Sequence, residues 1–265
     1  RSWNVTCPRR VCARIVARST NDGTSCRRCG SGTRQRRSCV TVDVGAATLV
    51  SDTRENLLTL GNNACLLGNE VLQYRTATLV SAGVYTLSGL LRGRRGTEWA
   101  QTGHVANERF VALQTSGMRR VPVLTSEIGA TRHYKAVTVG RALSSATDQA
   151  ITWSAVGLKP FAPVDLRGAR VSGDLTITWS RRTRLATNFT NGTVPLGETT
   201  EAYEVVVYTD NTYATVKRTI SATAQTASYT SAQQVTDFGS AQATVYVRVY
   251  QISATVGRGT AAQGG

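Results

Sequence analysis

Apolar and polar residues alternate with a period of two along most of the chain after about residue 40. The alternation occurs in short runs rich in Val, Thr, Tyr and Ile, and Gly, Asn and Asp separate the runs. Because this period places successive side chains on opposite faces of a strand, it predicts an all-β chain. The expected strands lie in CVTVDVGAATLV, EVLQYRTATLV, GVYTLSGLL, HYKAVTVG and QAITWSAVG.

One segment, DTRENLLTLGNNACLLG, departs from this period. Asp52 can cap a helix there, Leu57, Leu58 and Leu60 supply an apolar side, and Gly61 can end it. The pattern predicts one short helix in an otherwise all-β chain.

The chain divides by composition into three parts. Residues 1–40 are rich in arginine and cysteine, and VGLKPFAPVDLRG over 156–168 carries two closely spaced prolines that favour extended structure. We therefore expect an Arg/Cys-rich segment over 1–40, a β-rich module over 41–158 and a β-sandwich over 159–265.

Strict alternation marks the last part as a small sandwich. It resembles the fibronectin type III domain over about residues 162–258. That family has a Trp on its second strand, a Tyr opening the third and a Tyr-x-Val-Arg-Val strand near the end, and Trp179, Tyr203 and VYVRVYQIS fit these places. The residues expected on the core face are Leu175, Ile177, Trp179, Tyr203, Val205, Val207, Val245, Val247 and Val249.

The net charge of +15 over 265 residues is concentrated near the start. Residues 1–40 carry ten arginines against the single acid Asp22, and the rest of the chain is only mildly basic. Such a charge ordinarily indicates an anionic partner. Arginine outnumbers lysine 28 to 3, however, which a GC-rich genome also explains, so the charge is weak evidence for nucleic-acid binding.

Cys7, Cys12, Cys26 and Cys29 have the two-pair layout of a four-thiolate zinc site. Only the second pair is followed by a glycine that suits a zinc knuckle. A zinc site, disulfides and unpaired thiols all remain open for this segment.

The sequence offers little for catalysis. His104 and His133 lie in no metal-binding spacing, and no serine occupies a G-x-S-x-G elbow. Glu198 and Glu201 are close together, but a solvated loop before a strand explains them. We expect no catalytic residue, no cofactor and no membrane insertion, since no apolar run approaches the ~20 residues of a membrane span.

The stretch LSGLLRGRRGT, residues 87–97, lacks the lysine and the following helix of a phosphate-binding loop. Gly93 and Gly96 instead suit a turn after a strand over Val84–Leu91, with the arginines directed to solvent or to acidic neighbours. A long polar loop over 181–198 is also rich in arginine. The candidate partner contacts are Arg92, Arg94, Arg95, Arg181, Arg182 and Arg184.

The segment VYTLSGLLRGRRGTEWA followed by HVANERFVAL resembles a signature of the large tail-tip proteins of long-tailed bacteriophages and of related gene transfer agents. That signature reads Tyr-x-Leu-x-x-Leu-x-Arg-Gly-x-x-Gly-Thr, then a His, then GERFV; Asn107 stands where a Gly is usual. The matching residues are Tyr85, Leu87, Leu90, Arg92, Gly93, Gly96, Thr97, His104, Glu108, Arg109 and Phe110. Further blocks in the same order extend the resemblance over roughly residues 40–260.

The resemblance implies a structural virion protein at the distal end of the tail, in the baseplate hub, made in the bacterial cytoplasm. Its expected partners are other tail-tip proteins, copies of itself in a homotrimer, and the host cell surface. The chain is expected to be the C-terminal part of something longer. Two other classes stay open: a basic nucleic-acid-binding protein and a secreted sandwich-domain adhesin.

Overall fold

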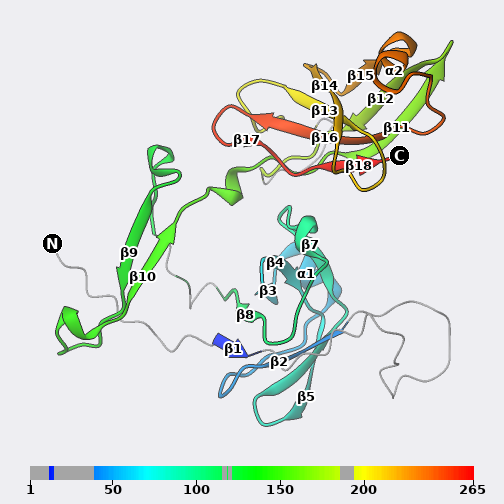
Figure 1. The fold of residues 1–265 in the computed structure, drawn as a ribbon. Coiled ribbons are helices and arrows are strands. Elements are labelled where there is room, and N and C mark those ends of the chain that lie inside the picture. Colours follow the sequence, from blue (N-terminus) through cyan, green and yellow to red (C-terminus); the bar gives the residue numbers. More distant parts are fainter. Residues whose placement is uncertain (1–11, 15–38, 115–117, 119–120, 186–193) are drawn as a thin grey trace, which may run out of the picture. The chain divides into compact units, whose positions relative to one another are not determined.

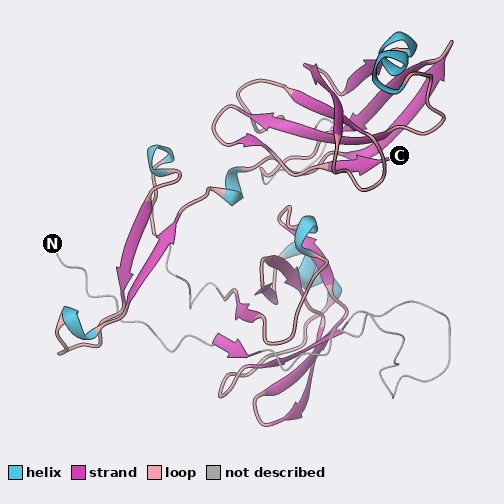
Figure 2. Cartoon of the chain, viewed as in Figure 1, coloured by secondary structure: helices cyan, strands magenta, loops and turns pink. Residues whose placement is uncertain are grey.

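The computed structural model describes residues 12–14, 39–114, 118, 121–185 and 194–265 (Figure 1). Its regular structure is mostly antiparallel strand (Figure 2), which confirms the all-β prediction. The chain divides into two compact units. One holds Arg1–Val123 and His133–Ile151, and the other holds Leu124–Arg132 and Thr152–Gly265.

The first unit contains a five-stranded antiparallel sheet and a three-stranded one. The larger has the order β1 (Cys12–Arg14), β8 (Arg109–Ala112), β3 (Ala64–Leu67), β4 (Glu70–Gln73) and β7 (Leu91–Arg94). The smaller has the order β2 (Cys39–Asp43), β6 (Val84–Ser88) and β5 (Thr76–Ser81). Both sheets contribute to one core, whose buried residues are Val42, Val44, Leu49, Cys65, Leu67, Leu72, Tyr74, Tyr85, Leu87 and Phe110.

The predicted helix is present as α1 (Arg54–Thr59). Thr53, not Asp52, is its N-cap, because the Thr53 hydroxyl accepts the Asn56 N–H at 3.2 Å. Asp52 instead accepts hydrogen bonds from the side chains of Asn56 and Asn62. The apolar side of α1 is narrower than predicted, because Leu57 is buried whereas Leu58 and Leu60 are more than half exposed.

Two strands, β9 (Thr131–Lys135) and β10 (Asp148–Thr152), form a separate two-stranded sheet. Short 3-10 helices occupy Glu98–Ala100, Thr125–Glu127, Leu143–Ser145 and Val156–Leu158.

The second unit is the predicted sandwich. One sheet has the order β11 (Val164–Val171), β12 (Asp174–Ser180) and β15 (Thr226–Tyr229). The other has the order β14 (Val216–Ala222), β13 (Tyr203–Tyr208), β16 (Tyr246–Ser253) and β17 (Gly257–Arg258), with β18 (Ala262–Gly264) also paired to β16. All nine residues predicted for the core face are buried. Trp179 and Tyr203 meet edge to face at 5.1 Å between ring centroids.

The outer face of β13 is less exposed than alternation predicts. Val206 and Tyr208 lie on this face but are only 1% and 6% exposed. Arg248 lies opposite Val206 in the register, and its guanidinium stacks on Tyr208 and on Tyr213. This aromatic and cationic cover buries a face that would otherwise be solvated.

A second helix, α2 (Ser231–Phe238), was not predicted and overturns the expectation of a single helix. It has a complete capping box, in which Thr230 and Gln233 satisfy each other's backbone N–H groups. Gly239 ends it in the left-handed conformation at φ 80°. These capping residues are visible in the sequence, but the segments on both sides of them have the alternation that predicts strands.

Candidate functional site

The carboxylate of Glu70 lies at the centre of a buried polar network in the first unit. Glu70 comes from β4 and is 0% exposed. Arg92 of β7 reaches it with Nε at 2.7 and 2.8 Å from the two oxygens, and with Nη2 at 2.7 Å. The Gly93 N–H donates to the same carboxylate at 2.7 Å. A buried anion therefore receives the donors that it requires.

His104 joins a second carboxylate to this network. Its Nε2 lies 2.9 Å from Glu70 Oε2, and its Nδ1 lies 2.6 Å from Glu108 Oε2. Arg92 also donates through Nη2 to the Gln101 carbonyl at 2.7 Å, within the segment that leads to His104. We refer to Glu70, Arg92, His104 and Glu108 as the Glu70 network.

Two glycines make room for the Glu70 network. A Cβ at Gly68 would lie 1.7 Å from Glu108 Oε1, and a Cβ at Gly93 would lie 2.2 Å from Gln101 Nε2. Both glycines also have positive φ angles, of 55° and 60°. The sequence therefore needs glycine at both positions for close approach as well as for backbone conformation.

The turn itself lies later than predicted. Gly93 is buried within β7, and the chain reverses through Arg95 and Gly96, whose φ angles are 58° and 79°. The Thr97 hydroxyl donates to the Arg94 carbonyl at 2.7 Å and accepts the Val71 N–H at 3.0 Å. Thr97 thereby ties this turn to β4.

Both ring nitrogens of His104 are occupied by carboxylates of the same chain. The imidazole is therefore held in one orientation between Glu70 and Glu108. The described residues include no cluster of His, Cys, Asp and Glu suited to holding a metal ion. Nor does any helix in that part of the chain have the length and apolarity to cross a membrane.

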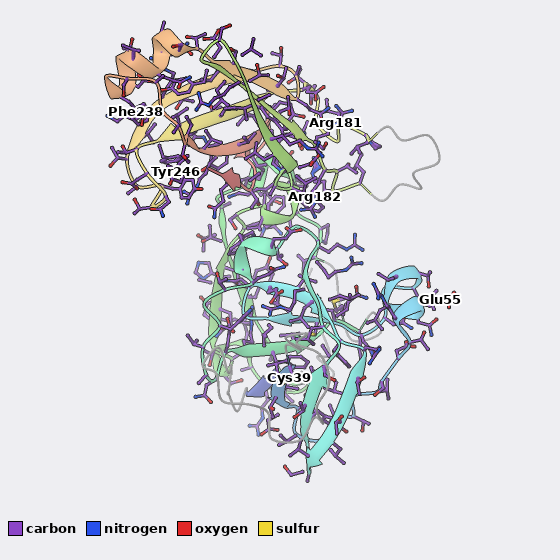
Figure 3. All side chains as sticks on the ribbon, turned by 90° about the vertical axis from the view of Figure 1, so that its right-hand side faces the viewer. Cys39, Glu55, Arg181, Arg182, Phe238 and Tyr246 are labelled. Atoms are coloured by element: carbon purple, nitrogen blue, oxygen red, sulfur yellow. The ribbon has the colours of Figure 1, made fainter. Side chains whose placement is uncertain are left out.

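The arginines of the second unit anchor the base of the 181–198 loop. Arg181 and Arg182 follow directly after β12 (Figure 3). Arg181 donates to the Val194 carbonyl at 2.7 and 2.9 Å and pairs with Glu201 at 2.9 Å. The Arg182 guanidinium stacks on Phe161 at 5.2 Å.

Arg184 makes the most buried ion pair of this region. It lies 3.0 Å from Glu198, whose side chain is 6% exposed, and donates to the Leu158 and Gly197 carbonyls. The explanation of Glu198 and Glu201 as solvated loop residues was therefore wrong. Both carboxylates hold the loop to the sandwich.

A third polar cluster joins β14, β15 and α2. Arg218 donates to both oxygens of Asp237 at 2.7 and 2.8 Å, and the Tyr229 hydroxyl donates to Asp237 at 2.8 Å. The hydrogen bond from Arg218, with that from Tyr229, holds the pKa of Asp237 below its ordinary value of 3.8. Burial, reinforced by Asp237, raises the pKa of Tyr229.

The six candidate contacts thus separate by environment. Arg92, Arg181 and Arg184 face carboxylates of the same chain, and Arg94 donates to Gln73 at 2.7 Å. Arg95 alone among the six is exposed. The sequence analysis did not identify Glu70 as a site residue. A signal was present, because Glu70 is a charged residue at the start of the apolar segment EVLQYRTATLV. Of the possible zinc ligands, Cys7, Cys26 and Cys29 lie outside the described residues, and Cys12 is described only as backbone in β1.

The comparisons with known proteins bear on the first unit. The family model described as "Rcc01698-like, C-terminal" matches residues 23–111, about a third of the chain. No curated protein matches the sequence. This stretch of the chain is therefore similar to the C-terminal domain of Rcc01698-like proteins. It contains every member of the Glu70 network.

Proposed function

We propose that this protein is a structural component of the distal tail tip of a long-tailed bacteriophage or gene transfer agent, where it contributes to host attachment. In this role it has no catalytic residue and no cofactor. Its partners are other tail-tip proteins, further copies of the chain, and the host surface.

The observation that carries the proposal is the coincidence of the tail-tip signature with the Glu70 network. Arg92, Gly93, His104 and Glu108 belong to the signature. In the structure the first three contact the buried Glu70 carboxylate, and Glu108 bonds to the other ring nitrogen of His104. A motif that serves to build a rigid turn is what a structural protein requires. The match to the Rcc01698-like C-terminal model over the same residues is compatible with this proposal.

The sandwich suits the attachment part of the role. Its buried core supports loops that can vary without disturbing the strands. The exposed Arg95 and the polar 181–198 loop are the segments that we propose contact partners, while Arg92, Arg181 and Arg184 hold those segments in place.

Immunogold labelling tests the location. An antibody raised against residues 162–265 should place gold at the tail tips of particles in a lysate of the source bacterium. Gold that is absent from tails, or found only on free protein, would contradict the proposal.

The nucleic-acid alternative makes a different prediction. Contacts to phosphates would give an affinity for duplex DNA that falls steeply with salt concentration. Three of the six candidate arginines already face carboxylates of the same chain, which leaves fewer cations for phosphate. We therefore expect weak binding of the full chain to duplex DNA at about 150 mM salt.

A further inference from the structure

The outer face of the larger sandwich sheet holds an arginine among tyrosines. Tyr246, Arg248 and Tyr250 alternate along β16 with valines that belong to the core, so these three side chains lie on the outer face. Tyr208 of β13 shares this face, and Tyr213, from the loop that follows β13, packs edge to face against it. We refer to Arg248 and these tyrosines as the Arg248 cluster.

Arg248 contacts aromatic rings instead of a carboxylate. Its guanidinium carbon lies 5.4 Å from the centre of the Tyr208 ring and 4.6 Å from that of Tyr213. Among the residues that the structure describes, no carboxylate forms an ion pair with it, whereas Arg184 and Arg218 of the same unit each have one. Arg248 is half-buried, and a cation that has lost part of its hydration is stabilised by an anion.

Stacking on rings does not consume the hydrogen-bond donors of Arg248. A stacked guanidinium keeps its five N–H groups in its own plane, where they can reach a planar anion. Gln263 of β18 lies directly opposite Arg248 in the register and is exposed, so its amide is on the same face. Burial and the neighbouring Tyr208 raise the pKa of Tyr250, and Arg248 opposes the rise, so the Tyr250 hydroxyl belongs to the same partly desolvated site.

Tyr213 is held beside Arg248 in an unfavourable backbone conformation. Its φ is 55°, in the left-handed region that bulky residues rarely adopt. Its hydroxyl donates to the Gly264 carbonyl at 3.3 Å, which ties the loop to β18. Backbone strain of this kind persists where the surroundings enforce it, and it is concentrated at ligand sites.

We propose that the Arg248 cluster binds the carboxylate of an acidic sugar, a uronic acid within a saccharide chain. The carboxylate accepts hydrogen bonds from the edge of the Arg248 guanidinium, in the planar pairing that arginine makes with such anions. The sugar hydroxyls bond to the Gln263 amide and to the hydroxyls of Tyr246 and Tyr250.

The polarity of this face favours a sugar over a peptide. Peptide and protein interfaces are centred on large side chains that fill desolvated pockets. Here the valine that lies opposite Arg248, Val206, is only 1% exposed and offers no such pocket. The groups around it are a cation, an amide and phenol hydroxyls, which bond to carboxylates and hydroxyls. An acidic sugar supplies both in one ligand.

This inference rests on the attachment part of the proposed function, because it names the chemistry of a surface ligand. Sugar binding by the purified full chain is measured in solution, whereas gold labelling measures the location of the protein in a particle. The two can therefore fail separately.

Calorimetric titration of the full chain with trigalacturonate tests the proposal. One ion pair and a few hydrogen bonds should give a Kd of about 0.1–1 mM. Maltotriose, which is neutral, and capped triglutamate, an acidic peptide of the same charge, should bind about tenfold more weakly or less. Equal binding of maltotriose would remove the carboxylate from recognition, and equal binding of triglutamate would make the ligand a peptide. Either result, or no binding of trigalacturonate at about 10 mM, would overturn the proposal.

Gln263→Glu gives the sharpest variant, because it places a carboxylate of the chain itself opposite Arg248. It should weaken trigalacturonate binding about tenfold or more and raise the melting temperature, since the new carboxylate occupies the cation. Gln263→Ala, at the same position but without the charge, should weaken binding only about threefold.

Thr219→Glu controls for charge repulsion alone. Thr219 is exposed on the same face, two strands or about 10 Å from Arg248, which exceeds the ~8 Å screening length at physiological salt. This variant should leave trigalacturonate binding nearly unchanged.

Arg248→Gln should also abolish binding, with circular dichroism to show that the sandwich still folds. Arg167→Gln, at an exposed arginine of the same unit, should bind like the wild type. Undiminished binding by Gln263→Glu, or by a folded Arg248→Gln protein, would show that the sugar binds elsewhere.

Discussion

The Arg92 guanidinium and the Glu70 carboxylate bond through Nε to both oxygens, and the carboxylate is completely buried. A buried charge pair is weak evidence of net stabilisation, but removing one partner is costly because the other charge is left without compensation. Glu70 also accepts from Gly93 and contacts His104, so a single side chain ties β4 to β7 and to the segment before β8.

Glu70→Gln should therefore lower the free energy of unfolding by about 3 kcal/mol. The amide nitrogen would face the donors of Arg92 or His104, so at least one donor would lose its acceptor. Chemical denaturation measures the effect. Glu55→Gln, on the exposed side of α1, should cost less than about 1 kcal/mol. Equal losses in the two variants would refute the central role of Glu70.

Gly68→Ala should break the contact between His104 and Glu108. Its Cβ would occupy the position of Glu108 Oε1, so the flexible Glu108 side chain must move away. The backbone strain at φ 55° adds about 1 kcal/mol. Gly61→Ala is the matched control, because Gly61 has φ 73° but nothing within 4 Å of the added Cβ.

The two glycine variants separate strain from collision. Gly61→Ala should cost about 1 kcal/mol and Gly68→Ala about 1.5–3 kcal/mol more, as the charged hydrogen bond is lost. Thermal unfolding of both variants beside the wild type gives the comparison. A Gly68→Ala protein no less stable than Gly61→Ala would mean that the Glu108 contact contributes nothing.

Asp237 should contribute stability that disappears in acid. Its pKa in the folded state lies below its ordinary value of 3.8, because Arg218 and Tyr229 bond to the ionised form. The folded state consequently binds fewer protons than the unfolded state as the pH falls past that value, and the stabilisation is lost through the folded pKa. Above 3.8 the stabilisation is fully present.

Asp237→Asn removes this dependence. Its unfolding free energy should lie below that of the wild type at pH 7, and the two should converge as the pH falls through the lowered pKa of Asp237 in the folded state. Urea titrations at several pH values test this. A difference that stays constant or grows in acid would contradict the assignment.

Arg184→Gln should destabilise the sandwich by about 2–3 kcal/mol, since it leaves the buried Glu198 carboxylate without its cation. Arg167 offers a contrast, because it and its partner Asp165 are 73% and 53% exposed. An exposed pair is worth about 0–1 kcal/mol, so Arg167→Gln should be nearly neutral. Comparable losses would mean that the burial of Glu198 does not matter.

The sequence by itself determined the fold class and most of the core. Every core residue that alternation selected in β12, β13 and β16 is buried, because a period of two directs one face of each strand to the core; Val206 and Tyr208, on the other face of β13, are buried in addition. The sequence also located α1, although Thr53 rather than the expected Asp52 caps this helix and only Leu57 of the three leucines is buried. The second helix, α2, was missed although its capping box stood in the sequence, since local cap signals were outweighed by the surrounding strand pattern.

Only the tertiary structure decided what the charged residues do. Glu70 lies 22 positions from Arg92 and 34 from His104, and no local period relates residues so far apart. The sheet order places β4 beside β7 and brings the three side chains together. The same holds for Arg184 with Glu198 and for Arg218 with Asp237, which meet across loops and strands. The local sequence determines which face of a strand or helix is apolar. The pairing of distant charges depends on strand order, because an ion pair requires a side-chain nitrogen and a carboxylate oxygen within about 4 Å of each other.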